Sequence, residues 1–466
     1  MRTAFLKLFI LLYIFSANIS TVYAEKNTNL SSIENTAEKT SLIDENASLN
    51  IIGESAILMD ASTGEILYEK NMHEQLYPAS ITKLMTVLLA FEYGKLDETV
   101  TFSEDAIFGI ERNSSHIALD VGEQITLEQC LYAILLQSAN EASLGVAEHI
   151  GGSKEGFAKM MNDRAKELGC KNTNFVNPNG LHDDNHYTSS YDMALIAKEV
   201  LKYDKFKEII STLKYEIPPT NKQPETRYLY AQHQMIKPPS IYVYEGCEGG
   251  KTGFTNQALN TLVTYAKRDN TELIAVVLKD TGANTYVDTK TLFDYGFENY
   301  ETLTAFSSDE FKTSENITQT YKKDFIDLGM LDMTAKNNVY ATVKKSENKP
   351  EYTQKLNINK ENLIPTINEG DSVGTLDIYN GDTLVGSSTL IATKTIEAIP
   401  EAELEAQYKE KVKNIIFYVL KIVVIIALII LIIFIINQKN KERIRLITRR
   451  KNRQKKYNMN RRRTIK

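Results

Sequence analysis

Apolar residues change their spacing along the chain, and these changes divide it into segments of different structure. A pattern typical of strands runs through residues 55–60 and 65–68, on either side of a turn at 61–64. Spacings of three and four residues then predict helices over residues 80–92, 126–136, 140–150, 157–168 and 191–201. Strands return at 259–265 and 273–278, and a last helix is expected over 289–297. Strands at both ends with helices between them predict an α+β or α/β sandwich with an antiparallel sheet, over residues 49–300.

Two neighbouring segments have a different character. Residues 301–398 contain short alternating runs separated by turns such as Asn380-Gly381-Asp382, which predicts a small all-β domain. Residues 25–48 are rich in Asn, Ser, Thr and Glu and poor in apolar side chains, so we expect a disordered spacer. Residues 399–413 are charged and are predicted to form a linker helix.

An apolar stretch near the C-terminus is long enough to cross a lipid bilayer. Residues 422–436 are uninterruptedly apolar, and apolar residues upstream extend the predicted transmembrane helix to 414–436, with Lys421 inside it. A buried helix of a soluble protein is the alternative, but such helices are rarely apolar on every face. The sequence therefore predicts a single membrane span.

Charge supports this interpretation. Residues 437–466 hold fourteen Lys or Arg and one Glu, a net +13, so the total of −6 leaves −19 on the remainder of the chain. A nucleic-acid-binding tail would also be basic, but here the basic segment follows a span directly. The positive-inside rule predicts a cytoplasmic tail and an extracytoplasmic body. Because the membrane explains the basic tail, no nucleic-acid partner is predicted.

The N-terminus agrees with export. Residues 1–24 carry Arg2 and Lys7, an apolar run and the sequence Val22-Tyr23-Ala24, which is the pattern of a signal peptide cleaved after Ala24. Retention as an uncleaved anchor is the alternative. Either way, the sequence indicates an exported protein held at the membrane.

Neither the cysteines nor the histidines indicate a metal or a cofactor. Three cysteines are too few for a disulfide framework. Buried free thiols are expected, and a Cys170–Cys247 bridge is the alternative. His182 and His186 have an H-x-x-x-H spacing but lie in a polar loop, where we expect them to be solvent-exposed; contact with the substrate is the alternative. No cofactor and no metal site is predicted.

Three short motifs carry the candidate chemistry. They are Ser80-Ile81-Thr82-Lys83, Ser138-Ala139-Asn140 and Lys251-Thr252-Gly253. On a helix, Ser80 and Lys83 share one face, so the amine can accept the proton of the hydroxyl and make it a nucleophile. Each motif alone also fits an ordinary helix end or hairpin, but the three in this order are the set found in penicillin-binding proteins and class A β-lactamases.

With these motifs the chain resembles the low-molecular-weight penicillin-binding proteins, which are serine-type D-Ala-D-Ala carboxypeptidases. Residues 77–80, 177–181 and 191–194 also match family patterns, and the resemblance extends over roughly residues 50–397. It implies a β-lactamase/transpeptidase-like sandwich followed by the small β domain and the membrane helix.

The resemblance also implies roles around the nucleophile. Ser80 would attack the carbonyl of the penultimate D-alanine, and Lys83 would accept the proton of Ser80. Ser138 would relay a proton to the leaving D-alanine, and Asn140 would hold the substrate amide.

The K-T-G strand would bind the other end of the substrate. Lys251 would supply positive potential and Thr252 would contact the terminal carboxylate. Gly253 would let the substrate backbone lie against the strand. The backbone N–H groups of Phe254 and Ser80 would form the oxyanion hole.

One departure from the family pattern concerns that carboxylate. Relatives usually carry an arginine shortly after the strand that follows K-T-G, whereas residues 280–289 contain none. Only Lys279 and Lys290 flank this stretch. How the carboxylate is bound is therefore open.

The predicted function is removal of the terminal D-alanine from peptidoglycan stem peptides ending in D-Ala-D-Ala, with β-lactams as inhibitors. A class A β-lactamase is one alternative, but no E-x-x-L-N follows Asn140 where that family places its deacylating glutamate. A non-catalytic wall-binding scaffold is another. Endopeptidase action on cross-links uses the same mechanism and is not separable by sequence.

Overall fold

The computed structural model describes residues 48–309 and 311–463, so the predicted signal peptide and nearly all of the predicted spacer lie outside the described residues. The chain forms two compact units. The first contains the described residues up to Phe306 together with Asn338–Lys355 and Asp377–Ser387. The second contains Ser307–Asn337, Leu356–Leu376 and the chain from Ser388 onward.

An antiparallel five-stranded sheet organises the first unit. Its strands lie in the order β2 (Ile66–Lys70), β1 (Ser55–Asp60), β9 (Thr271–Asp280), β8 (Leu259–Arg268) and β7 (Cys247–Thr255). Successive strand residues point to opposite faces, so Ile57 and Met59 join one hydrophobic core while Ala56 and Leu58 join the other. The sheet is thus buried on both faces.

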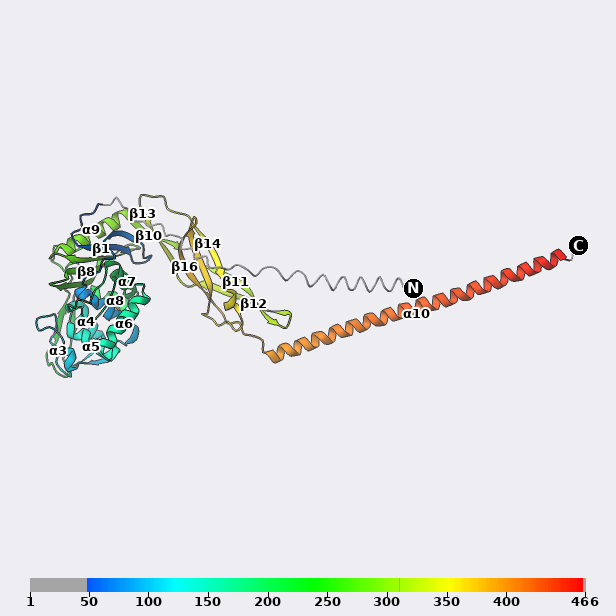
Figure 1. Cartoon of the computed structure of the whole chain (residues 1–466), viewed down its shortest axis with the longest axis horizontal. Coiled ribbons are helices and arrows are strands. Elements are labelled where there is room, and N and C mark those ends of the chain that lie inside the picture. Colours follow the sequence, from blue (N-terminus) through cyan, green and yellow to red (C-terminus); the bar gives the residue numbers. More distant parts are fainter. Residues whose placement is uncertain (1–47, 310, 464–466) are drawn as a thin grey trace. The chain divides into compact units, whose positions relative to one another are not determined.

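Helices cover these two faces unequally (Figure 1). Helix α9 (Asn284–Asn299) packs on one face through Leu292, Phe293 and Phe297. The helices of the opposite face are α2 (Lys83–Tyr93), α4 (Leu127–Gln137), α5 (Asn140–Gly151), α6 (Lys154–Glu167) and α7 (Ser190–Val200). The predicted sandwich with terminal strands and central helices is confirmed.

Local sequence signals fixed several of these helix ends. Gly94 caps the C-terminus of α2, as predicted. Thr126 and Gln129 form a reciprocal capping box at the start of α4. Four short strands and two short helices escaped the sequence analysis because each has few residues with which to show a period. They are the strands β3 (Thr99–Thr101), β4 (Gln124–Thr126), β5 (Lys214–Ile217) and β6 (Arg227–Tyr230) and the helices α3 (Glu104–Phe108) and α8 (Asp204–Ser211).

The C-terminal part is all-β, as predicted. One sheet has the strand order β11 (Lys312–Tyr321), β12 (Asp324–Ala335), β16 (Thr383–Ala392), β15 (Ser372–Asn380) and β14 (Tyr352–Ile358). Its buried side chains include Ile317, Leu331, Val373 and Leu390. Strands β10 (Tyr300–Phe306) and β13 (Val339–Lys344) form a separate antiparallel pair within the first unit.

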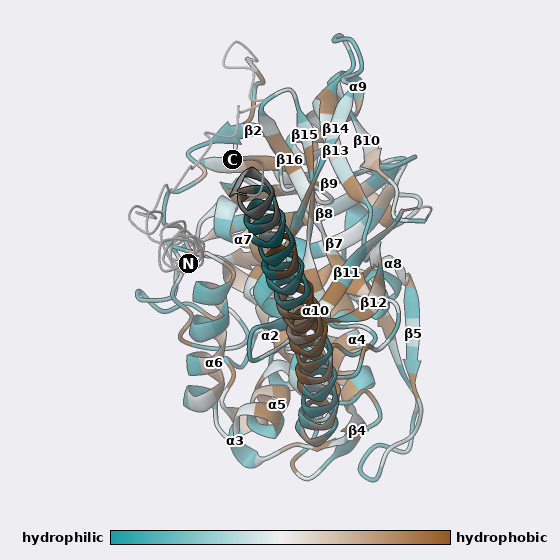
Figure 2. Cartoon of the chain, turned by 90° about the vertical axis from the view of Figure 1, so that its right-hand side faces the viewer, coloured by the Kyte–Doolittle hydropathy of each residue, from teal (hydrophilic) through white to brown (hydrophobic). Residues whose placement is uncertain are grey.

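The charged linker segment and the apolar span are one continuous helix, α10 (Glu401–Arg463). Within the described residues, this is the one helix long and apolar enough to cross a membrane, and none of its apolar window is buried. Figure 2 shows its hydrophobic central stretch and the hydrophilic C-terminal part that follows.

Candidate active site

The candidate nucleophile lies on a tight turn immediately before α2. Ser80 belongs to the 3-10 helix η1 (Ala79–Thr82) rather than to the α-helix itself. Ala79 has φ of +51°, a left-handed conformation that is uncommon for a residue with a Cβ. The turn is held by the surrounding protein, since Thr261 Oγ1 donates a hydrogen bond of 2.8 Å to the Pro78 carbonyl.

Lys83 brings a buried amine to this serine. Its Nζ lies 2.9 Å from Ser80 Oγ and 2.7 Å from Asn140 Oδ1, and it also donates to the Asn179 carbonyl. The side chain is completely buried. A neutral amine has two N–H donors, so the two oxygen acceptors of Asn140 and Asn179 leave its lone pair for the Ser80 hydroxyl.

The surroundings favour that neutral form. Desolvation lowers the pKa of Lys83 well below its ordinary value, and the positive charge of Lys251 lowers it further. Glu141 acts in the opposite direction on the pKa of Lys83, but burial raises the pKa of the Glu141 carboxyl itself. A lysine prepared in this way can act as a general base.

The second motif forms the junction between α4 and α5. Ser138 ends α4 in a left-handed conformation with φ of +57°, and Asn140 begins α5. The Ser138 Oγ is buried and has no hydrogen-bond partner among the described residues. A hydroxyl that lines the pocket with an unused donor and acceptor can serve a bound substrate.

The third motif lies on the edge strand β7. Lys251 is 1% exposed, and its Nζ donates 2.8 Å to the Thr252 carbonyl. Burial lowers the pKa of Lys251 to about 7. Its charge therefore changes near neutral pH, which the sequence analysis did not predict.

Gly253 also meets a requirement that the sequence analysis did not predict. A Cβ at this position would lie 2.4 Å from Thr261 Oγ1 and 2.8 Å from the backbone nitrogen of Ser80. Such distances are too short for any side chain, so the glycine allows β7 to approach the nucleophile turn. The same proximity places the Ser80 N–H beside the strand that carries Phe254, whose side chain is exposed.

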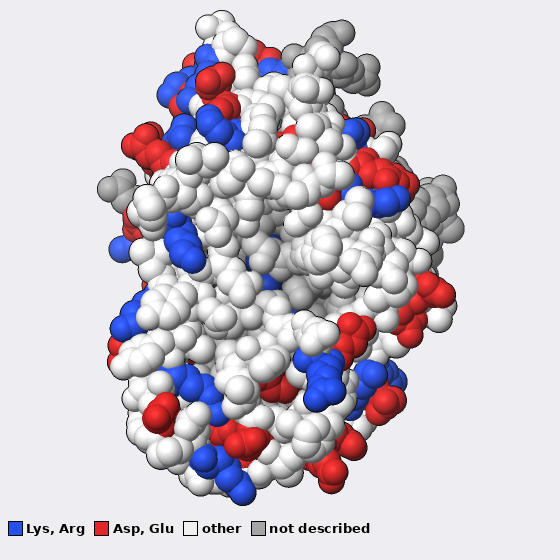
Figure 3. Space-filling model, turned by 90° about the vertical axis from the view of Figure 1, so that its left-hand side faces the viewer, with Lys and Arg blue, Asp and Glu red and all other residues white. Residues whose placement is uncertain are grey.

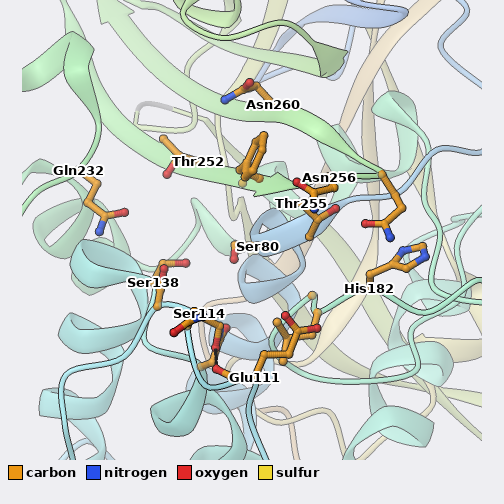
Figure 4. A pocket seen from close by; sticks show the side chains of 18 of the residues that line it. Ser80, Glu111, Ser114, Ser138, His182, Gln232, Thr252, Thr255, Asn256 and Asn260 are labelled. Atoms are coloured by element: carbon orange, nitrogen blue, oxygen red, sulfur yellow. Dashed lines mark hydrogen bonds between the residues drawn. The ribbon is translucent and has the colours of Figure 1, made fainter.

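A pocket with a volume of about 740 Å³ joins these motifs. Figure 4 shows Ser80 at its centre, with Gln232 and Thr252 on one side and Asn256 and His182 on the other. Of the predicted site residues, six line the pocket: Ser80, Ser138, Asn140, Thr252, Gly253 and Phe254. Lys83 and Lys251 lie beneath it.

Other lining residues were not predicted. Tyr286 and Gln232 lie far from the nucleophile in the sequence, and Asn260 follows the K-T-G motif by seven residues; none of them lies in a segment with a chemical signature. Asn179, which binds Lys83, lies in the quoted 177–181 segment but was assigned no role. Only the fold brings these residues to the site.

The expectation that both histidines are solvent-exposed is wrong. His186 is 2% exposed, and burial lowers its pKa to about 4. Its Nδ1 accepts from Val176 N at 3.0 Å, so Nε2 carries the proton and donates 2.8 Å to Thr82 Oγ1, which donates 2.8 Å to the Ala79 carbonyl. This series of hydrogen bonds supports the left-handed residue Ala79, which precedes Ser80. His182 is partly buried against Tyr77 and lines the pocket.

The remaining expectations concern bridges and metals. Cys130, Cys170 and Cys247 are all free thiols, so the Cys170–Cys247 bridge is not formed. No cluster of three or more His, Cys, Asp or Glu side chains that could hold a metal ion occurs among residues 48–309 and 311–463.

Comparisons with known proteins agree with this geometry. A family model described as D-alanyl-D-alanine carboxypeptidase matches residues 41–282, and one described as penicillin-binding protein 5, C-terminal domain, matches residues 300–398. The chain is 34% identical over 352 residues to the D-alanyl-D-alanine carboxypeptidase DacF of Bacillus subtilis (strain 168), covering 74% of this chain and 85% of the relative.

Relatives from Haemophilus influenzae provide a second curated sequence and a solved structure. The carboxypeptidase DacA is 33% identical over 296 residues, covering 60% of this chain and 70% of the relative. The crystal structure of penicillin binding protein 5 is similar with a TM-score of 0.57 at 26% identity, covering 75% of this chain and 99% of that chain.

Proposed function

The chain belongs to the D-alanyl-D-alanine carboxypeptidase family of serine hydrolases, and from this premise we propose that it removes the terminal D-alanine of peptidoglycan stem peptides through an acyl-enzyme on Ser80. The observation that carries the proposal is the buried Lys83 amine, 2.9 Å from Ser80 Oγ and bound by two oxygen acceptors. This arrangement gives the serine a neutral base.

Acylation begins when Lys83 takes the Ser80 proton and Oγ attacks the carbonyl carbon of the penultimate D-alanine. The backbone N–H groups of Ser80 and Phe254 receive the developing oxyanion; such a donor typically contributes about 100- to 1000-fold in rate. The proton then passes through Ser138 to the nitrogen of the leaving D-alanine, the C–N bond breaks, and the ester to Ser80 remains. Asn140 orients both the base and the substrate amide.

Water hydrolyses the ester and regenerates Ser80. A β-lactamase needs a carboxylate to activate that water quickly. Among the described residues, Glu111 is the acidic side chain that lines the pocket, and the buried Glu141 accepts a hydrogen bond from Ile117 N. In the described part of the chain, the hydrogen bonds of Ser80 and Lys83 involve neither glutamate. We therefore expect β-lactams to acylate Ser80 and remain bound.

The test is the intact mass of the full chain in detergent after incubation with benzylpenicillin, measured at once and again after hours. A stable single adduct that is missing in Ser80→Ala supports the proposal. An adduct that disappears within seconds indicates a β-lactamase. Absence of any adduct contradicts the proposal and favours a non-catalytic scaffold.

We also propose that α10 anchors the chain in the bilayer with the basic residues after 436 in the cytoplasm. The apolar stretch and the charge that follows it support this orientation. In intact spheroplasts, externally added trypsin should leave an epitope at the C-terminus uncut, and permeabilisation should expose it. Cleavage before permeabilisation would reverse the orientation.

A further inference from the structure

The leaving-group end of the pocket contains no fixed cation, although the substrate proposed above ends in a carboxylate. No Lys or Arg in the described part of the chain lines the pocket; the titratable lining side chains there are Glu111, His182 and Tyr286. The face drawn in Figure 3 is hollowed at its centre. The border of the hollow is mainly uncharged, and Lys or Arg atoms show only at its floor.

The two lysines that flank residues 280–289 are already paired with carboxylates. Lys279 forms an ion pair with Glu54 at 2.7 Å, and Lys290 forms one with Asp294 at 2.6 Å. Lys251 is buried beneath the strand and donates to the Thr252 carbonyl. Flanking lysines therefore do not replace the arginine that was missing from residues 280–289.

A neutral aromatic residue occupies the first turn of α9 instead. Tyr286 lines the pocket, and its ring stacks on Tyr242 with centroids 5.2 Å apart. The edge contact with His233, at 5.9 Å, holds the same ring from another direction. Because burial raises the pKa of Tyr286, its hydroxyl stays neutral. Gln232 and Thr252, on the same side of Ser80, add further uncharged polar groups (Figure 4).

We propose that this subsite binds the leaving residue through neutral hydrogen bonds and the Tyr286 ring, so that the enzyme also cleaves D-alanyl peptides whose last carboxyl group is blocked as an amide. The inference rests on the proposed function and specifies its substrate class. In the reaction, Ser80 displaces D-alaninamide in place of D-alanine, and water then releases the acyl group as before.

The test compares kcat/KM for an N-acylated tripeptide ending in D-Ala-D-Ala with that for its C-terminal amide, using the full chain in detergent. A charged hydrogen bond to a carboxylate would favour the free acid by about 10- to 100-fold. We expect the two substrates to differ by less than about fivefold. A preference for the free acid of about tenfold or more, the range of a charged hydrogen bond, would overturn the proposal.

Two variants locate the effect. Tyr286→Arg should raise the preference for the free acid at least about tenfold, because it places a guanidinium at the subsite. Val287→Arg is the matched control: it adds the same charge one residue away, at a side chain that is 47% exposed and does not line the pocket, and should leave the preference unchanged. If Tyr286→Arg behaves like Val287→Arg while still folded, Tyr286 does not face the leaving residue and the assignment is wrong.

Benzylpenicillin labelling of Ser80 separates this inference from the proposed function. It reports folding and nucleophile activation in each variant. If benzylpenicillin does not label the unmodified chain, the carboxypeptidase function itself is contradicted. Normal labelling together with strong preference for the free acid contradicts only the neutral subsite.

Discussion

The two ends of the pocket are constructed differently. Around Ser80, every polar group of the base is assigned: the Lys83 amine contacts Ser80, Asn140 and Asn179, and the side chain is fully buried. At the leaving-group end, Gln232 is exposed and Thr252 is half-buried. Bond formation needs reacting groups held in a defined geometry, which the burial of Lys83 provides, whereas the leaving-group end is open to water.

Removing the base should have the largest effect. Lys83→Ala should reduce the acylation rate by benzylpenicillin about 1000-fold or more, because the Ser80 proton loses its acceptor. Lys83→Arg should be equally defective, since a guanidinium stays protonated. Stopped-flow acylation measures both. Activity of Lys83→Arg within tenfold of the unmodified chain would exclude Lys83 as the base.

The next largest effect is expected from the junction of the two ends. Gly253→Ala places a Cβ 2.8 Å from the Ser80 nitrogen, so β7 must move away from the nucleophile turn. Displacing one oxyanion donor should lower acylation about 100-fold. Gly386→Ala is the control for an added methyl group, because its backbone is not left-handed and its Cβ would meet only a side-chain methyl of Val339. Equal acylation rates in the two variants would refute this role for Gly253.

A smaller effect concerns pH at the leaving-group end. The pKa of Lys251 is about 7, so its positive charge is present below that pH and is lost as pH rises through it. Any residual preference for the free acid over the amide should therefore decline from pH 6 to pH 8.5, by about threefold for a screened charge. In Lys251→Met the preference should not vary with pH. A preference that rises with pH would contradict this assignment.

The smallest effect on rate should come from His186, which acts at a distance from the reacting atoms. His186→Ala leaves Thr82 without its buried donor and should cost about 1–3 kcal/mol in the free energy of unfolding. Acylation should slow only several-fold, because Ala79 retains other support. Denaturant melts and acylation rates measure the two effects. A loss of stability below 0.5 kcal/mol would show that the chain of hydrogen bonds is not structural.

The same histidine gives a pH test of stability. Its pKa is lowered by burial to about 4 in the folded chain, below its ordinary value of 6.5. The unfolded chain therefore binds the proton first, and stability should fall as pH decreases from about 6.5 to 4. This part of the pH dependence should be reduced in His186→Ala. An unchanged slope would assign it to other groups.

Sequence patterns were sufficient for what repeats along the chain and for what the motifs name. The alternating and helical periods identified the central strands, most helices and the α10 span, and the three motifs named the residues around Ser80. They could not reveal contacts made by residues distant in sequence. His186 looked like a polar loop residue because its burial depends on Thr82 and Val176, and Tyr286 carries no motif. Nor did the K-T-G motif reveal that Gly253 lies close to the Ser80 backbone.

The hydrogen bond from Thr261 to Pro78 joins residues 183 positions apart in the chain. Strand β1 likewise pairs with β9, with Ser55 opposite Leu278. We expect contacts of such separation to form late, because closing a long loop costs entropy before any contact offsets it. The turn that carries Ser80 is thus expected to be complete only when nearly the whole first unit has folded. Ser80 would then gain its base and its oxyanion donors at the same stage of folding. Before that stage its hydroxyl would be an ordinary, unreactive alcohol, so reactivity would arise together with the native sheet.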